Sequence, residues 1–231
     1  MPARTLLVAP VAICLLVLAG CGDDEPNQRK AFMEFLQTRI VNKPGLHVPK
    51  LTAEEAAAFG DYAKHYAVIF DFNEDLSQSV STPMSKALAA GMPRSLDDVV
   101  TRRTDIAALE GGFAKMRTAL DQQLATADAA HTALKQPADL KPVYDAAYDR
   151  DVTQPAKVMA EVFPDADAAM KAILALADFI AAHPAVKVQG SMIETSDPSL
   201  RQPLQMLLDA VRAKTDAINN AQRKFNALVS G

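Results

Sequence analysis

Apolar residues recur at three- and four-residue spacing along most of the chain, the pattern of amphipathic helices. The first stretch of this kind predicts a helix from Asn27 to Val41, followed by a break at Pro44. Thr52 and Glu55 form a capping box, which predicts the start of a second helix. That helix should end before Pro83, because proline interrupts helical hydrogen bonding.

A third apolar stripe predicts a long helix that starts at Ser95 and ends at Pro137. The pair Gly111 and Gly112 interrupts the stripe, and two adjacent glycines are unfavourable in a helix. We therefore expect a kink or a close helix crossing at this pair.

Prolines divide the next part of the sequence into shorter predicted elements. We expect two short helices, Lys141 to Asp151 and Pro155 to Val162, and then a longer helix from Asp165 to Ala182. The segment from Val186 to Thr195 alternates around a glycine and is either a small two-stranded hairpin or a loop. In the last part of the chain an apolar residue recurs every seven positions, at Leu204, Val211, Ile218 and Phe225.

These elements predict an all-α protein, an elongated antiparallel helical bundle with at most one small β-hairpin. Composition agrees, since alanine supplies 42 of 231 positions and aromatic residues only 6%. A share of 49% hydrophobic and 23% charged residues excludes a disordered chain. The net charge of −4 excludes a general basic surface for nucleic acid.

The N-terminus has the three parts of a secretory signal: cationic Arg4, an apolar run from Leu6 to Leu18, and small residues before Cys21. The run is shorter than the roughly 20 residues that a membrane-spanning helix needs. Leu18-Ala19-Gly20-Cys21 matches the bacterial lipobox, which predicts cleavage before Cys21 and lipidation of its thiol. The alternative is ordinary signal cleavage, which would leave a free secreted thiol.

This interpretation divides the chain into a signal peptide (residues 1–20), a lipidated tether (21–27) and one helical-bundle domain (28–231). Cys14 leaves with the signal, so the mature chain could form no internal disulfide. Gly22, in place of the aspartate that retains lipoproteins in the inner membrane, favours the periplasmic face of the outer membrane. Asp23 keeps the inner membrane open as an alternative.

The sequence contains none of the common nucleophile, phosphate-loop, dinucleotide or zinc motifs. Its four histidines never stand three or four residues apart, so no helix offers a paired-imidazole metal site. Asp71 to Asp75 opens like a calcium loop, but Leu76 and Thr82 replace the required glycine and glutamate. We therefore expect no metal or other cofactor.

His131 lies on the apolar stripe of the third helix, between Ala127 and Leu134. It is either a structural residue bonded to an acidic or backbone group near the turn at Pro137, or a functional histidine oriented by Asp128. The three aspartates that follow suggest either an acidic patch or the solvated face of a helix: Asp145, Asp149 and Asp151.

Three stretches carry a resemblance to a known family. They are Gln28-Arg29-Lys30-Ala31-Phe32, then Leu51-Thr52-Ala53 with Phe59-Gly60, and above all the run from Asp128 to Gln136 that leads into Asp139-Leu140-Lys141-Pro142-Val143. With these residues the chain resembles the YiaF-like bacterial lipoproteins, a domain of unknown function, over essentially the whole mature chain. The resemblance implies a lipid-anchored envelope protein and transfers no functional residues.

Two functions remain open at this point. The favoured hypothesis is a non-enzymatic envelope protein that binds a partner protein, a lipid or a cell-wall component through its helical surface, because no catalytic motif is present. The alternative is a hydrolase or another enzyme with a site near His131 and Asp128.

Overall fold

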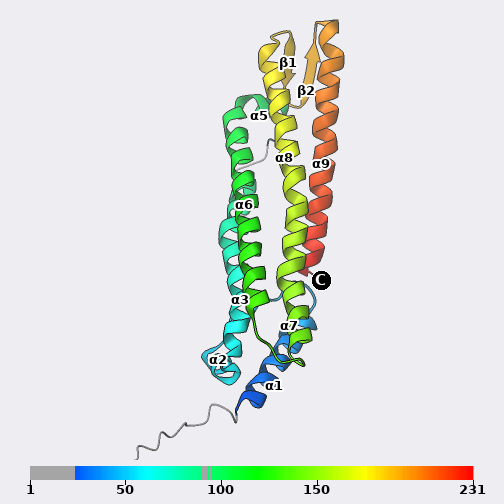
Figure 1. The fold of residues 1–231 in the computed structure, drawn as a ribbon. Helices are drawn as coiled ribbons and strands as arrows, with labels where there is room; N and C mark the ends of the chain where they lie inside the picture. The colour runs from blue at the N-terminus through cyan, green and yellow to red at the C-terminus, as the bar shows by residue number, and fades with distance from the viewer. Residues whose placement is uncertain (1–23, 90–92, 94, 231) are drawn as a thin grey trace, which may run out of the picture.

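The computed structural model describes residues 24–89, 93 and 95–230 and consists mainly of helices that run along one long axis (Figure 1). Helix α1 lies at one end of this elongated bundle and the small hairpin β1–β2 lies at the other. The predicted fold class, an all-α bundle with one small β-hairpin, is confirmed. We call the end with α1 the base and the end with the hairpin the tip.

The base is built from α1 (Glu25–Leu36), the π-helical segment η1 (Gln37–Val41) and α2 (Ala53–Phe59). Helix α1 begins two residues before the expected Asn27, and a proline in its first turn favours this start. Its Phe32 is completely buried and packs on Phe59, with the ring centroids 5.4 Å apart. Aromatic packing therefore fixes α1 to the bundle.

The second predicted helix is divided and longer than expected. The capping box is confirmed, since the Glu55 N–H donates to Thr52 Oγ1 (3.1 Å) and the Thr52 N–H to Glu55 (2.9 Å). Gly60 ends α2 with a φ of 55°, which glycine adopts readily. Helix α3 (Tyr62–Leu76) then continues through η2 (Ser77–Ser81) into α4 (Thr82–Ala89). The predicted end before Pro83 is wrong, because Pro83 lies in the first turn of α4, where a missing N–H costs little.

The third helix begins as expected but breaks elsewhere. Ser95 caps α5 (Leu96–Thr101) by accepting the Asp98 N–H at 3.1 Å. The break falls at Arg102, after which α6 (Arg103–Ala133) runs without interruption through both glycines. A Cβ added at Gly111 or Gly112 would meet nothing within 4 Å among the described residues. The expected close helix crossing at this pair is therefore wrong.

The expected short helices between Lys141 and Ala182 join into one helical path. Helix α7 (Lys141–Tyr148) passes through η3 (Asp149–Thr153) into α8 (Gln154–Ala182). Pro164 lies inside α8 with its side chain exposed, while the neighbouring Phe163 is buried. The predicted breaks are wrong here, because burial of the apolar stripe outweighs the local cost of proline.

The segment from Val186 to Thr195, expected to be either a hairpin or a loop, forms a hairpin at the tip. Strands β1 (Val186–Gln189) and β2 (Met192–Thr195) pair antiparallel, and Gly190 in the turn has a φ of 62°. The 3-10 turn η4 (Pro198–Leu200) then leads into α9 (Arg201–Ser230), which packs along α8.

The heptad positions of α9 are described in its first half. Leu204 is buried and Val211 half-buried, whereas the side chains of Ile218 and Phe225 lie outside the described part.

The hydrophobic core of the described residues consists of two clusters. A large cluster joins α1, α3, α6, α7 and α8 as far as Ala177. A small one joins the end of α8, the hairpin and α9 through Leu176, Ile180, Val186 and Leu204.

Candidate functional site

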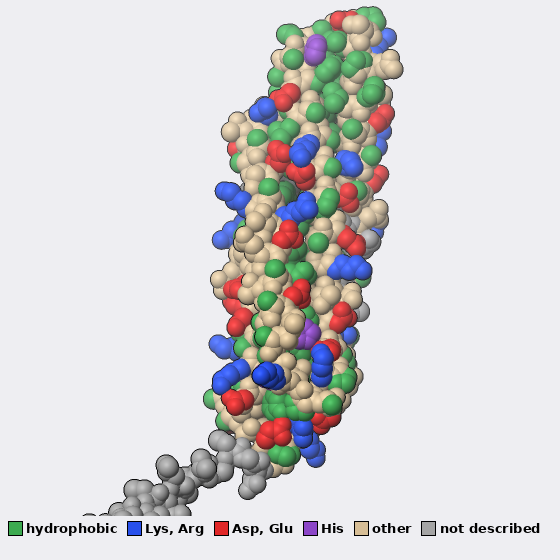
Figure 2. Space-filling view, viewed as in Figure 1, with side chains coloured by type: hydrophobic (Ala, Val, Ile, Leu, Met, Phe, Trp, Pro, Cys, Tyr) green, Lys and Arg blue, Asp and Glu red, His purple; other side chains and the backbone are tan. Residues whose placement is uncertain are grey.

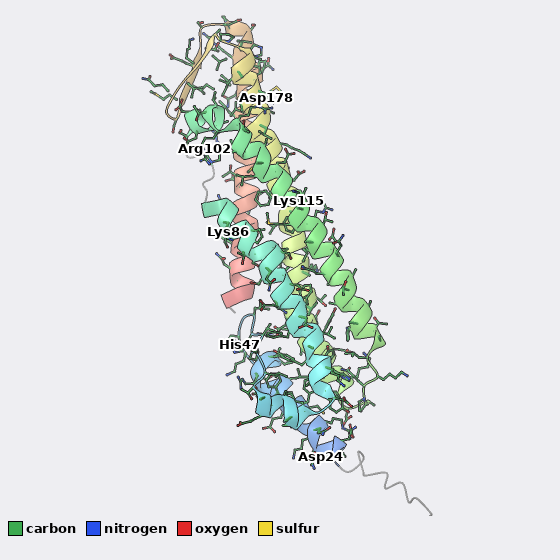
Figure 3. The ribbon with its side chains drawn as sticks, turned by 90° about the vertical axis from the view of Figure 1, so that its left-hand side faces the viewer. Asp24, His47, Lys86, Arg102, Lys115 and Asp178 are labelled. Carbon is green, nitrogen blue, oxygen red and sulfur yellow. The ribbon has the colours of Figure 1, made fainter. Side chains whose placement is uncertain are left out.

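The predicted lipidation residue, Cys21, lies outside the described residues, three positions before the first of them, Asp24. Figure 3 shows Asp24 at the base of the bundle. The polar groups proposed near His131 belong to the same half of the molecule, where α6 ends and α7 begins.

His131 pairs with a carboxylate of the following helix. Its Nε2 lies 2.8 Å from Oδ1 of Asp145 on α7, and its side chain is 21% exposed. Lys141, one turn earlier on α7, donates to both oxygens of the same carboxylate at 3.0 and 2.8 Å. His131 thus bonds to an acidic group, one of the two kinds of partner expected, but this group lies in α7, eight residues after Pro137, and not at the turn itself. The bond closes the end of α6 onto α7.

Asp128 has a different partner from the one expected. Its Oδ1 accepts the Tyr148 hydroxyl at 2.8 Å, whereas His131 bonds to Asp145. The His131 ring packs on the Tyr148 ring, with centroids 4.1 Å apart. The expectation that Asp128 orients His131 is therefore wrong: both residues bind α7, but through separate contacts.

A second group of contacts extends the same junction to α3 and α1. The Tyr144 hydroxyl donates to the backbone carbonyl of His65 at 2.7 Å, and Gln136 lies 3.3 Å from His65 Nδ1. On α3, the Tyr62 hydroxyl donates to Glu25 of α1. The polar groups thus connect four elements of the base: α1, α3, α6 and α7.

Burial and charge shift the titration of these groups in different directions. For Asp145, burial acts to raise the pKa, but the bonds from Lys141 and His131 hold the pKa below its usual range. Burial and the Glu25 carboxylate raise the pKa of Tyr62 to about 12. Burial lowers the pKa of His65, which favours a neutral imidazole at neutral pH.

An imidazole held by a carboxylate can in principle accept or return a proton. However, Lys141 also donates to the Asp145 carboxylate, and the His131 ring packs on the Tyr148 ring. Within residues 24–89, 93 and 95–230, no group of three His, Cys, Asp or Glu could hold a metal ion. Asp71 to Asp75 belong to α3, so they form helix rather than a calcium loop.

One functional candidate was missed by the sequence interpretation. Asp151 lies in η3 and is the one charged residue that is fully buried in the described chain, with 0% exposure. The hypothesis of an acidic patch or solvated face is wrong for it, because it lies four residues after Ala147 and four before Pro155, both buried. This helical spacing was the signal that could have placed it inward.

The tip carries a different kind of surface. Met192 of β2 and Met206 of α9 are 69% and 66% exposed. Met206 borders an open hollow of about 430 Å³, which is also lined by Ser199, Gln202, Pro203 and Leu207. Figure 2 shows hydrophobic side chains gathered at the surface of this end. Exposed apolar side chains that are grouped at one end of a protein can serve as a contact site.

A family model described as "Protein of unknown function (DUF3053)" matches residues 7–226, and the chain belongs to this family. Among its relatives is "Uncharacterized protein YiaF" of Escherichia coli (strain K12), 34% identical over 176 residues, which are 75% of this chain and 74% of the relative. The protein of the same name in Shigella flexneri matches to the same extent. No solved structure matches the chain significantly. No helix of the described part is long and apolar enough to cross a membrane.

Proposed function

We propose that the protein is a lipid-anchored envelope lipoprotein that binds a partner protein through its tip and has no catalytic role. The anchor is the lipid on Cys21, at the periplasmic face of the outer membrane. The lipobox and Gly22 support this location, with the inner membrane as the alternative. A diacylated or triacylated cysteine would hold the base permanently at the membrane, since a single chain binds only marginally.

The observation that carries the binding role is the position of the exposed methionines. Met192 and Met206 lie at the end of the bundle opposite Asp24, so they face away from the anchoring membrane (Figures 1 and 3). Helix α8 alone has 29 residues, which corresponds to a length of roughly 44 Å. The membrane that holds the base is therefore out of reach of the tip.

Methionine side chains are flexible and are frequent at protein-binding surfaces that accept partners of different shapes. A partner protein of the envelope suits this tip better than the polar sugars of the cell wall. A lipid ligand or a cell-wall partner is the other outcome of the experiment below.

Photo-crosslinking in living cells tests the binding role. A photoreactive amino acid at position 206 or 192 should form an adduct with one defined protein, whereas the same probe at the exposed Asp121 of α6 should not. Equal adducts at all three positions, or none at the tip, would contradict binding through this end.

The second candidate is a hydrolase centred on His131. The specific observation in its favour is the 2.8 Å contact between His131 and Asp145, since a histidine oriented by a carboxylate is the arrangement of a general base. This role requires loss of activity without loss of stability when His131 is replaced, whereas a structural role requires loss of stability.

A further inference from the structure

Asp151 occupies an unusual position for a carboxylate. It lies in the π-helical segment η3, fully buried, and both of its oxygens lack a hydrogen-bond partner among the described residues. An ionised carboxylate in such a place loses its hydration without replacement. π-helical turns are rare and occur often at functional positions.

The loop of residues 42–51 lies against this segment and is held by packing of Val48 and Leu51 on the core and by a few polar contacts. Arg150, next to Asp151, donates to the carbonyls of Lys43 and of Gly45, the latter at 2.9 Å. The Tyr66 hydroxyl of α3 donates to the Pro49 carbonyl at 2.6 Å. The loop is thus fastened near both of its ends by side chains that surround Asp151.

Between these two fastenings the loop and α3 border a hollow. This open hollow of about 280 Å³ is lined by Leu46, Val48, Phe70, Asn73 and Glu74. Figure 3 shows His47, the exposed residue in the middle of the loop, at one side of the lower bundle. Asn73 donates to the Asp151 backbone carbonyl at 2.9 Å, so the hollow and the buried carboxylate are neighbours.

The charged groups around Asp151 do not neutralise it. Arg150 is the cation that favours its ionised form, but it also holds the loop carbonyls. From α3, Tyr66 faces Asp151 as a neutral phenol. From η1, Arg39 is paired with Glu55 at 3.5 Å.

The remaining elements packed on η3 add no compensating charge. Tyr148 of α7 donates to Asp128, and Lys157, the first charged residue of α8, is exposed. From the loop itself, the backbone N–H of His47 lies near the Asp151 carboxylate and favours its ionised form, but neither carboxylate oxygen has a hydrogen bond of normal geometry within the described residues, so the cost of burial prevails.

We propose that Asp151 is a proton-controlled latch for the 42–51 loop: the neutral acid is stable beneath the closed loop, and its ionisation releases the loop so that water reaches the carboxylate. This device is independent of the lipid anchor and of the binding tip.

The direction of the pH effect follows from linkage. Burial raises the pKa of Asp151 to about 7, despite the His47 backbone and Arg150. An exposed aspartate titrates near ~4, so between about pH 4 and pH 7 the closed state binds more protons than the open state. Closure therefore weakens as pH rises through this window and changes no further well above pH 7.

Hydrogen–deuterium exchange of the full chain tests the proposal, read as protection factors corrected for intrinsic exchange. With a pKa of about 7 for Asp151 in the closed state and about 4 in the open state, the equilibrium constant for opening of the 42–51 loop should increase about 10-fold between pH 6 and pH 8. In Asp151→Asn, a neutral variant of the same shape, protection of the loop should be independent of pH. The matched control Asp149→Asn, at an exposed aspartate of the same segment, should keep the 10-fold change.

Two results would overturn the latch. One is loop protection in the wild-type protein that does not change between pH 6 and pH 8, a result that needs no variant. The other is a folded Asp151→Asn protein that still shows the wild-type change.

Discussion

At the scale of single residues, His131 illustrates how a polar side chain can hold a helix junction. The ring bonds to Asp145 and covers Tyr148, so α6 and α7 meet through contacts that are both polar and aromatic. The side chain keeps 21% of its surface exposed, so water can partly replace what is lost on its removal.

Replacing His131 with alanine should therefore destabilise the protein by about 1–2 kcal/mol, the lower part of the range for a lost buried hydrogen bond. For a chain of this size the melting temperature should fall by about 2–8 °C. Thermal unfolding followed by circular dichroism measures this, with the exposed His47→Ala as control. An unchanged melting temperature together with a lost cellular phenotype would instead support the enzymatic alternative.

Asp145 predicts how the same junction responds to acid. Burial tends to raise its pKa, but Lys141 and His131 lower it below the usual value, so the native protein binds this proton less readily than the unfolded chain. The stabilisation is complete above about pH 4 and is lost as the pH falls through the lowered pKa. Asp145→Asn should lose less stability between pH 5 and pH 2 than the wild type, measured by urea unfolding. Identical acid profiles would remove Asp145 from this account.

At the scale of elements, helix starts that depend on local capping residues could be predicted from the sequence, whereas helix continuity that depends on burial could not. The helix starts at Thr52 and Ser95 were predictable, because a cap depends on residues three positions apart. The breaks expected before Pro83 and between Asp151 and Pro155 do not occur, because both prolines occupy first helical turns and the apolar stripe continues beyond them. Tertiary packing determines whether the helix continues at these prolines, and no local sequence pattern indicates that packing.

The same distinction applies to the candidate site. The distinctive run around His131 was recognisable, and an acidic or backbone partner was expected, yet which group would bind it depended on how α7 packs against α6. Asp151 was missed because a charged residue was assumed to face water. Its spacing from buried Ala147 points inward, and the π-helical register of η3 is not encoded by any simple periodicity.

The glycines provide a test of the helices themselves. Gly111→Ala should raise stability by about 0.5–1 kcal/mol, because α6 is regular there and an added Cβ meets nothing within 4 Å. Gly60→Ala should do the opposite, since its φ of 55° is strained for any residue with a Cβ, and the added Cβ would also displace the Gln28 side chain. Chemical denaturation of both variants measures the contrast. A destabilised Gly111→Ala protein would indicate a kink or a partner at that position.

At the scale of the whole molecule, the elongated shape separates two surfaces. The base joins α1, α3, α6 and α7 and lies next to the first described residue, Asp24. The tip has its own small apolar cluster and carries Met192 and Met206. The proposed anchor at one end and the proposed contact surface at the other would suit a protein that reaches away from a membrane.

The proposed function requires that the base is attached to the membrane, and the proposed attachment depends on one sulfur atom, that of Cys21. Cys14 provides a matched control, because it lies in the same N-terminal segment but before the predicted cleavage site. Its replacement leaves the lipobox Leu18-Ala19-Gly20-Cys21 intact.

Incorporation of labelled palmitate in growing cells is the most direct test of the account. Wild type and Cys14→Ser should both be labelled and remain with the membrane fraction, whereas Cys21→Ser should carry no label and should be released or retain its signal. Labelling of the Cys21→Ser protein, or an unlabelled wild type, would contradict the lipid anchor and with it the proposed function.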